Sequence, residues 1–64
     1  MAKNLRRSRR ARGLTQEELA DRAGVYRNYI GMLERAENAA TVDMLEKLAD
    51  VLEIDPMELL DRRP

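Results

Sequence analysis

Hydrophobic side chains recur at intervals of three and four residues along most of this chain, a spacing typical of helices that bury one face. The clearest run follows the order i, i+3, i+4 and i+7, at Leu45, Leu48, Ala49 and Leu52. Ile30 and Leu33 form a second apolar stripe, three positions apart. No segment shows the signal of a strand, a linker or an internal repeat. The pattern therefore predicts an all-α protein.

Capping residues indicate where five helices begin and end. Thr15 is an N-cap candidate, and Glu18 three residues later completes a capping-box pattern. Thr41 is another N-cap candidate, and the Asp-Pro pair at 55–56 is typical of a cap followed by proline at the first helical position. Residues 34–40 are expected to form a loop, although their alanines could instead prolong the third helix by a turn. The predicted helices cover residues 2–12, 16–23, 26–35, 42–53 and 56–61 of a single domain, residues 1–64.

Residues 15–34 are predicted to form two short helices joined by a tight turn. Where two helices cross closely, the facing residue must be small, and Ala20 meets this requirement. The turn favours a residue that tolerates positive φ, and Gly24 stands there. The apolar stripe of the second helix packs on the first, so a different set is expected to face outward: Tyr26, Arg27, Asn28, Gly31 and Met32. These features indicate a helix-turn-helix.

Composition argues against an enzyme. The 64 residues include no cysteine and no histidine, so disulfides, thiolate metal sites and the commonest general base are all missing. The chain also has a single serine and no glycine-rich phosphate loop. No apolar run approaches the roughly 20 residues that a membrane span needs. We therefore expect a cytoplasmic protein without cofactor or metal.

Charge is distributed unevenly, although the formal net charge is zero. Residues 1–35 contain nine Lys or Arg residues and four acidic residues, a net charge of +5. Residues 36–64 contain three basic and eight acidic residues, a net charge of −5. Because the basic half carries the predicted helix-turn-helix, this dipolar distribution favours nucleic acid as its partner. The alternative is a simple bias of charged residues toward helix ends.

The combined pattern resembles the lambda-repressor-like helix-turn-helix family, also called the Cro or XRE type. The matching segments are G-L-T-Q-E-E-L-A at 13–20, A-G-V at 23–25, Y-I at 29–30, L-E-R at 33–35, L-E-K-L-A at 45–49 and M-E-L-L at 57–60. The resemblance covers about residues 3–60. It implies a compact five-helix domain, usually dimeric, that binds operator DNA as a transcriptional regulator. It also implies a prokaryotic or phage-type protein that is associated with the nucleoid when it is bound to DNA.

The chain departs from the family pattern mainly in the loop after L-E-R. Ala36 and Ala40 stand where the family commonly has glycine and proline, and Glu37 occupies a position that is often basic. Tyr26 replaces the small hydroxyl residue that often begins the recognition helix, and Ser8 replaces an apolar residue. The loop departures affect the expected phosphate contacts of this loop and leave the fold unaffected.

Two groups of residues are candidates for contacts with DNA. Arg27 suits guanine O6 and N7, and Asn28 suits adenine N6 and N7. Met32 is expected to meet a thymine methyl group, and Tyr26 to stack on a base or to reach a base or phosphate. Phosphate contacts are expected from a second set: Gln16, which the resemblance also assigns to this role, with Arg10, Arg12, Tyr29 and Asn38. The alternative for each arginine is a solvated side chain.

Two further sets are expected to serve structure and assembly. The resemblance places Arg9 against Glu34 as a partly buried ion pair. The last two helices offer more apolar residues than one small core needs, which favours a twofold interface that includes four of them: Leu52, Ile54, Met57 and Leu60. The alternative is that all of these side chains belong to the core of a single chain.

These expectations describe a sequence-specific, double-stranded-DNA-binding transcriptional regulator, a repressor. It would bind a pseudo-palindromic operator as a homodimer, with the recognition helix in the major groove. RNA polymerase or another protein would be a further partner, and no membrane is involved. The alternative is a protein-interaction module, such as an antitoxin that binds a partner protein through its acidic half.

Overall fold

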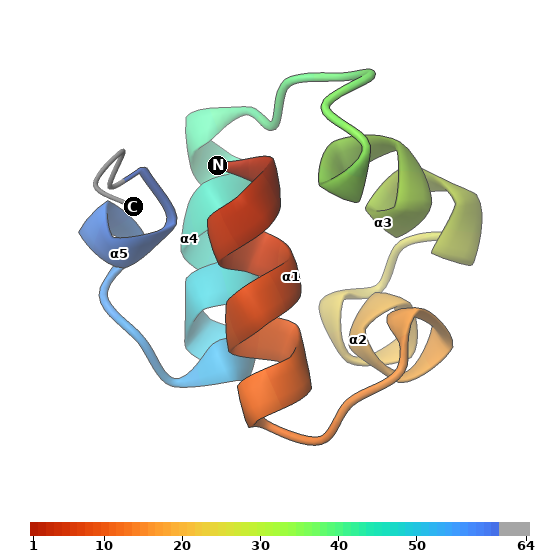
Figure 1. Cartoon of the computed structure of the whole chain (residues 1–64), viewed down its shortest axis with the longest axis horizontal. Coiled ribbons are helices and arrows are strands. Elements are labelled where there is room, and N and C mark those ends of the chain that lie inside the picture. Colours follow the sequence, from red (N-terminus) through yellow and green to blue (C-terminus); the bar gives the residue numbers. More distant parts are fainter. Residues whose placement is uncertain (61–64) are drawn as a thin grey trace.

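The computed structural model describes residues 1–60, which form five helices and no strand. The helices are α1 (Ala2–Ala11), α2 (Gln16–Ala23), α3 (Arg27–Glu34), α4 (Val42–Leu52) and α5 (Pro56–Leu60). Figure 1 shows α1 in front of α4, with α2 and α3 on one side of this pair and α5 on the other. The predicted all-α architecture is confirmed. The predicted end of the last helix at residue 61 lies outside the described residues.

The N-terminal caps form as the local sequence predicts. The Thr15 hydroxyl accepts a hydrogen bond from the Glu18 backbone N–H at 3.0 Å, and the Glu18 carboxylate accepts one from the Thr15 N–H at 2.9 Å. The hydrogen bond that the Glu18 carboxylate accepts from the Thr15 N–H lowers the pKa of Glu18, and a hydrogen bond between this carboxylate and the Thr15 side chain lowers it further. Thr41 caps α4 in the same way, by accepting from the Met44 N–H. These bonds satisfy backbone donors that a helix cannot pair internally.

A residue in the left-handed backbone conformation follows each of the first four helices. Gly13 and Gly24, with φ of +69° and +72°, follow α1 and α2, and the non-glycine residues Ala36 and Glu53, with φ of 59° and 57°, follow α3 and α4. After α3, the Ala36 N–H bonds to the Leu33 carbonyl and the Glu37 N–H to the Met32 carbonyl, which is a Schellman motif. Ala36 therefore ends α3, and residues 35–41 form a connection to α4 instead of a further helical turn.

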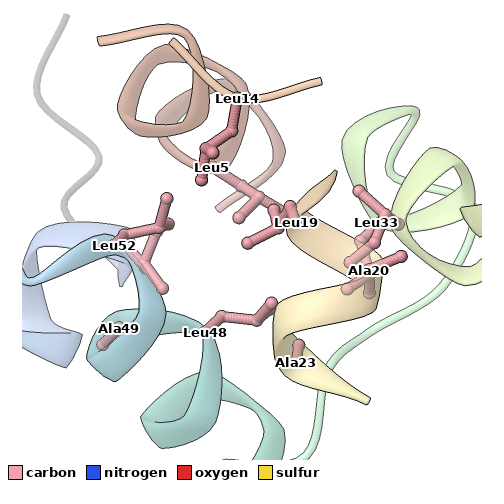
Figure 2. Packing of buried hydrophobic residues seen from close by; sticks show 11 residues of the cluster. Leu5, Leu14, Leu19, Ala20, Ala23, Leu33, Leu48, Ala49 and Leu52 are labelled. Atoms are coloured by element: carbon pink, nitrogen blue, oxygen red, sulfur yellow. The ribbon is translucent and has the colours of Figure 1, made fainter. Parts of the chain in front are cut away.

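Every helix contributes a fully buried side chain to one core, and Figure 2 shows how several of them converge. The largest are Leu5, Leu19, Ile30, Leu33, Leu48, Leu52 and Leu59. The prediction that Leu52 belongs to a dimer interface was wrong, because this side chain is fully buried within a single chain. The other three residues of the predicted interface are more exposed than Leu52: Ile54 is partly buried, and Met57 and Leu60 are 69% and 46% exposed.

Candidate nucleic-acid interface

A tight corner between α2 and α3 sets the direction of the third helix. Gly24 adopts the left-handed conformation, and its N–H and that of Val25 bond to the carbonyls of Asp21 and Ala20. Ala20 is buried in the helix contact, which fits the requirement for a small residue at the crossing. Because Ile30 and Leu33 are fully buried in the shared core, the opposite face of α3 is directed outward.

The start of α3 carries exposed polar side chains. Tyr26, which precedes the helix as its N-cap, is 86% exposed, and Arg27 and Asn28 are exposed in the first turn. Met32 is partly buried one turn later. Arg27, Asn28 and Met32 line a shallow hollow that also includes Gln16 from α2. The structure thus brings three of the four predicted base-reading residues together with one predicted phosphate contact.

Gly31 was expected to face outward, and it lines the hollow with Arg27, Asn28 and Met32, but another side chain buries it. The guanidinium of Arg35 lies across it: Arg35 Nη1 is 3.0 Å from the position that a Cβ would take at Gly31. Arg35 and Glu37 also line the hollow at the α2–α3 corner, and sequence reasoning assigned neither residue a role there. The helical spacing of Arg35, four residues after Gly31 and eight after Arg27, is the signal that could have found it.

A buried ion pair between Arg9 of α1 and Glu34 of α3 lies next to this corner. Glu34, 3% exposed, accepts hydrogen bonds from Arg9 Nε at 2.6 Å and Arg9 Nη2 at 3.1 Å. Arg9 Nη1 donates to the Leu14 carbonyl at 2.7 Å, and Arg6 donates to the Glu34 carbonyl at 2.9 Å. The two partners expected to pair are thus in direct contact, and their bonds join α1 to the end of α3.

The same carboxylate orients Gln16. Gln16 Nε2 donates to Glu34 Oε1 at 3.1 Å, so one N–H of the amide is used inside the protein and the second remains for an external acceptor. Burial by itself raises the pKa of Glu34, but the hydrogen bonds from Arg9 and Gln16, with the charges of Arg9 and Arg6, lower it overall. Glu34 is therefore a charged acceptor that fixes the amide at the N-terminus of α2.

The other predicted phosphate contacts have different surroundings. Arg10 is exposed on α1, and Asn38 is exposed in the loop after α3, where its side-chain oxygen accepts from the Ala39 N–H. Tyr29 is partly buried against the core. Arg12 pairs with Glu53, the left-handed residue after α4, and both side chains are exposed, so its contact with a phosphate stays a prediction.

Among residues 1–60, no group of three or more His, Cys, Asp or Glu side chains is arranged to hold a metal ion. None of the five described helices has the length and apolar character that crossing a membrane requires. The hollow at the α2–α3 corner is lined by arginine and amide side chains, which can donate hydrogen bonds to a ligand.

Known proteins resemble this chain in both sequence and architecture. A helix-turn-helix family model, HTH_3, matches residues 5–59. The control protein C.SmaI of Serratia marcescens is 40% identical over 63 residues, which are 98% of this chain and 75% of that protein.

Solved structures agree with this match. The restriction-modification controller protein C.AhdI from Aeromonas hydrophila superposes with a TM-score of 0.87 at 41% identity, over 91% of this chain and 84% of that chain. SinR, a regulator of Bacillus subtilis, was solved in complex with DNA, and it superposes with a TM-score of 0.89 at 31% identity, over 94% of this chain and 97% of that chain. Since the family match runs from α1 into α5, the chain belongs to the helix-turn-helix family HTH_3.

Proposed function

We propose that this chain is a DNA-binding transcriptional regulator that reads double-stranded DNA with α3 in the major groove. The observation that carries the proposal is the pair of exposed side chains at the start of α3, Arg27 and Asn28, beside the fixed amide of Gln16. The major groove of B-DNA admits an α-helix, and these two side chains match the edges of guanine and adenine. The similar structure of SinR with DNA supports the same role here.

Four side chains of the hollow and the neighbouring Tyr26 have a part in this binding mode. The second amide N–H of Gln16, at the positive end of α2, donates to a phosphate and sets the distance between the protein and the duplex. Arg27 and Asn28 then read adjacent bases, while Met32 meets a thymine methyl group one turn along. Tyr26, which is almost fully exposed at the start of α3, contributes a ring or hydroxyl contact to the same region.

We further propose that the regulator is a repressor that binds as a homodimer. Met57 and Leu60 expose apolar surface on α5, and Leu60 lines an apolar hollow with Met1, Ala2 and Leu45. A second copy that covers this surface would place two recognition helices on one face of a duplex. The operator would then be pseudo-palindromic, with half-sites about 34 Å apart.

The test of DNA reading starts with a selection of bound duplexes from a random pool, followed by anisotropy titrations with the selected site and a scrambled site. Arg27→Ala should weaken binding to the selected site by roughly 1–3 kcal/mol and relax the preference at one base pair. Arg7→Ala, which removes an exposed arginine of α1 outside the hollow, is the matched control and should affect both sites equally. An equal loss on all sequences for Arg27→Ala would make this residue a phosphate contact instead of a base reader.

The same titrations separate this function from the alternative of a protein-interaction module. A DNA-reading protein should bind with an affinity that falls steeply with salt and differs between sequences. A chain that binds no duplex at any salt concentration would overturn the proposal and favour a protein partner for the acidic half, residues 36–64.

The dimer has a test of its own. Met57→Glu places a charge on the exposed face of α5 without touching the core, and it should convert a dimeric mass to a monomeric one in sedimentation equilibrium. Binding to a half-site should persist, since the recognition helix is unchanged. A monomeric mass for the unmodified chain at tens of micromolar would contradict the homodimer.

A further inference from the structure

The Arg35 side chain is 55% exposed, and its guanidinium lies back along α3, over the backbone of Gly31. Any larger residue at 31 would meet the guanidinium, because a Cβ there would lie 3.0 Å from Arg35 Nη1. The glycine thus provides the space in which the guanidinium rests on the outward face of the helix.

Glu37 holds the guanidinium in this place with two contacts. Arg35 Nη2 donates to Glu37 Oε1 at 3.1 Å, and Arg35 Nε lies 3.1 Å from Glu37 Oε2, so the two ends of the fork are both engaged. The Schellman motif at Ala36 turns the chain back after α3 and brings the carboxylate within reach. The hydrogen bond from Arg35, followed by its charge, lowers the pKa of Glu37, so the carboxylate is ionised at neutral pH.

This pair lies on the same surface as the predicted DNA contacts. Arg35 and Glu37 line one hollow with Gln16, Arg27 and Asn28. A duplex that engages the first turn of α3 would therefore bring its backbone close to both charges. A carboxylate in that position repels phosphates, and it also occupies the guanidinium that would otherwise attract them.

We propose that Arg35 is a further phosphate-binding residue of this interface and that Glu37 competes with the DNA phosphate for its guanidinium. The inference rests on the proposed DNA-binding function. Before a phosphate can bind, Arg35 must leave Glu37, and the exchange replaces a contact inside the chain with one to DNA. Because the pair is exposed, the competition is modest and adjusts affinity instead of abolishing it. Glu37 thereby lowers the affinity of this chain for every duplex.

The test is a double-mutant cycle on DNA affinity and its salt dependence. Glu37→Gln should raise affinity for selected and scrambled duplexes alike, by roughly two- to fivefold. It should also steepen the slope of log K against log salt by up to about 0.9, the value for one additional phosphate contact. In the Arg35→Ala background, Glu37→Gln should lose most of this gain. Glu17→Gln removes an equal charge from the exposed first turn of α2 without contacting Arg35, and it measures the general effect of charge.

The outcomes separate the inference from the function on which it rests. A gain from Glu37→Gln that is equal with and without Arg35, or no greater than that of Glu17→Gln, would overturn the inference. It would mean that Glu37 acts by general repulsion alone, and the DNA-binding function would stand. Failure of the unmodified chain to bind any duplex would overturn both. The paired state has an independent check in the free protein, where Glu37→Gln should shift the Arg35 Nε–H resonance in an NMR spectrum.

Discussion

Replacement of Glu34 by glutamine tests the buried ion pair that joins α1 to the helix-turn-helix. The substitution keeps the size of the side chain but removes its charge, and it turns one acceptor oxygen into an N–H donor. That donor would face the donors of Arg9 or Gln16, which bond to the two carboxylate oxygens at 2.6 to 3.1 Å. Arg9, only 8% exposed, would keep its charge without a counter-ion.

The expected loss is large for a domain of this size. Breaking a buried pair by removal of one partner costs roughly 3–5 kcal/mol. A single core in a chain of fewer than about 70 residues rarely supplies more than about 3–5 kcal/mol of stability. Glu34→Gln should therefore be largely unfolded in plain buffer, and its stability should become measurable when an excluded osmolyte such as sucrose is added to shift the equilibrium toward the folded state.

Urea denaturation followed by far-ultraviolet circular dichroism measures this loss. The matched control is Glu17→Gln, an exposed position whose substitution should change stability by no more than about 0.5 kcal/mol. A double variant, Arg9→Met with Glu34→Leu, should recover much of the loss, because it removes both charges and leaves neither unpaired. Equal denaturation midpoints for Glu34→Gln and the unmodified chain would refute the argument.

The same pair predicts a dependence on pH. The pKa of Glu34 is lowered in the folded state below its ordinary value of 4.5. A lowered folded pKa means that the group stabilises the fold above the unfolded pKa and loses this contribution as the pH falls through the folded value. The unmodified chain should thus lose stability as the pH falls below about 4.5, and Glu34→Gln should lack this component.

Two further substitutions test other parts of the structure. Ala36→Gly should raise the free energy of unfolding by about 0.5–1 kcal/mol, because glycine adopts the left-handed conformation without a Cβ penalty; Ala39→Gly in the same loop is the control, and an equal gain there would contradict the reason given. Leu52→Ala should cost about 2–5 kcal/mol in urea denaturation, as expected for a fully buried leucine. A loss of dimer without a loss of stability for Leu52→Ala would return this residue to an interface.

Much of the local architecture was decided by sequence within a few positions. Thr15 and Glu18 specify the start of α2 by their own hydrogen bonds, and Gly24 specifies the turn after it. The 3.6-residue period identified the buried faces of α3 and α4. These features follow from residues less than about five apart, so no knowledge of distant contacts is needed to predict them.

The partners of particular side chains were decided only when the helices packed. The period shows that Leu52 is buried but not whether its own core or a second chain covers it. Likewise, no local signal joins Arg12 to Glu53 across 41 positions or Gln16 to Glu34 across 18. The crossing angles of the helices and the turn at Ala36 decide these pairs, because a long polar side chain reaches whichever partner the packed backbone brings near. The sequence alone therefore determined the helices and the outward face of α3, and tertiary packing determined which polar side chains have partners inside the protein.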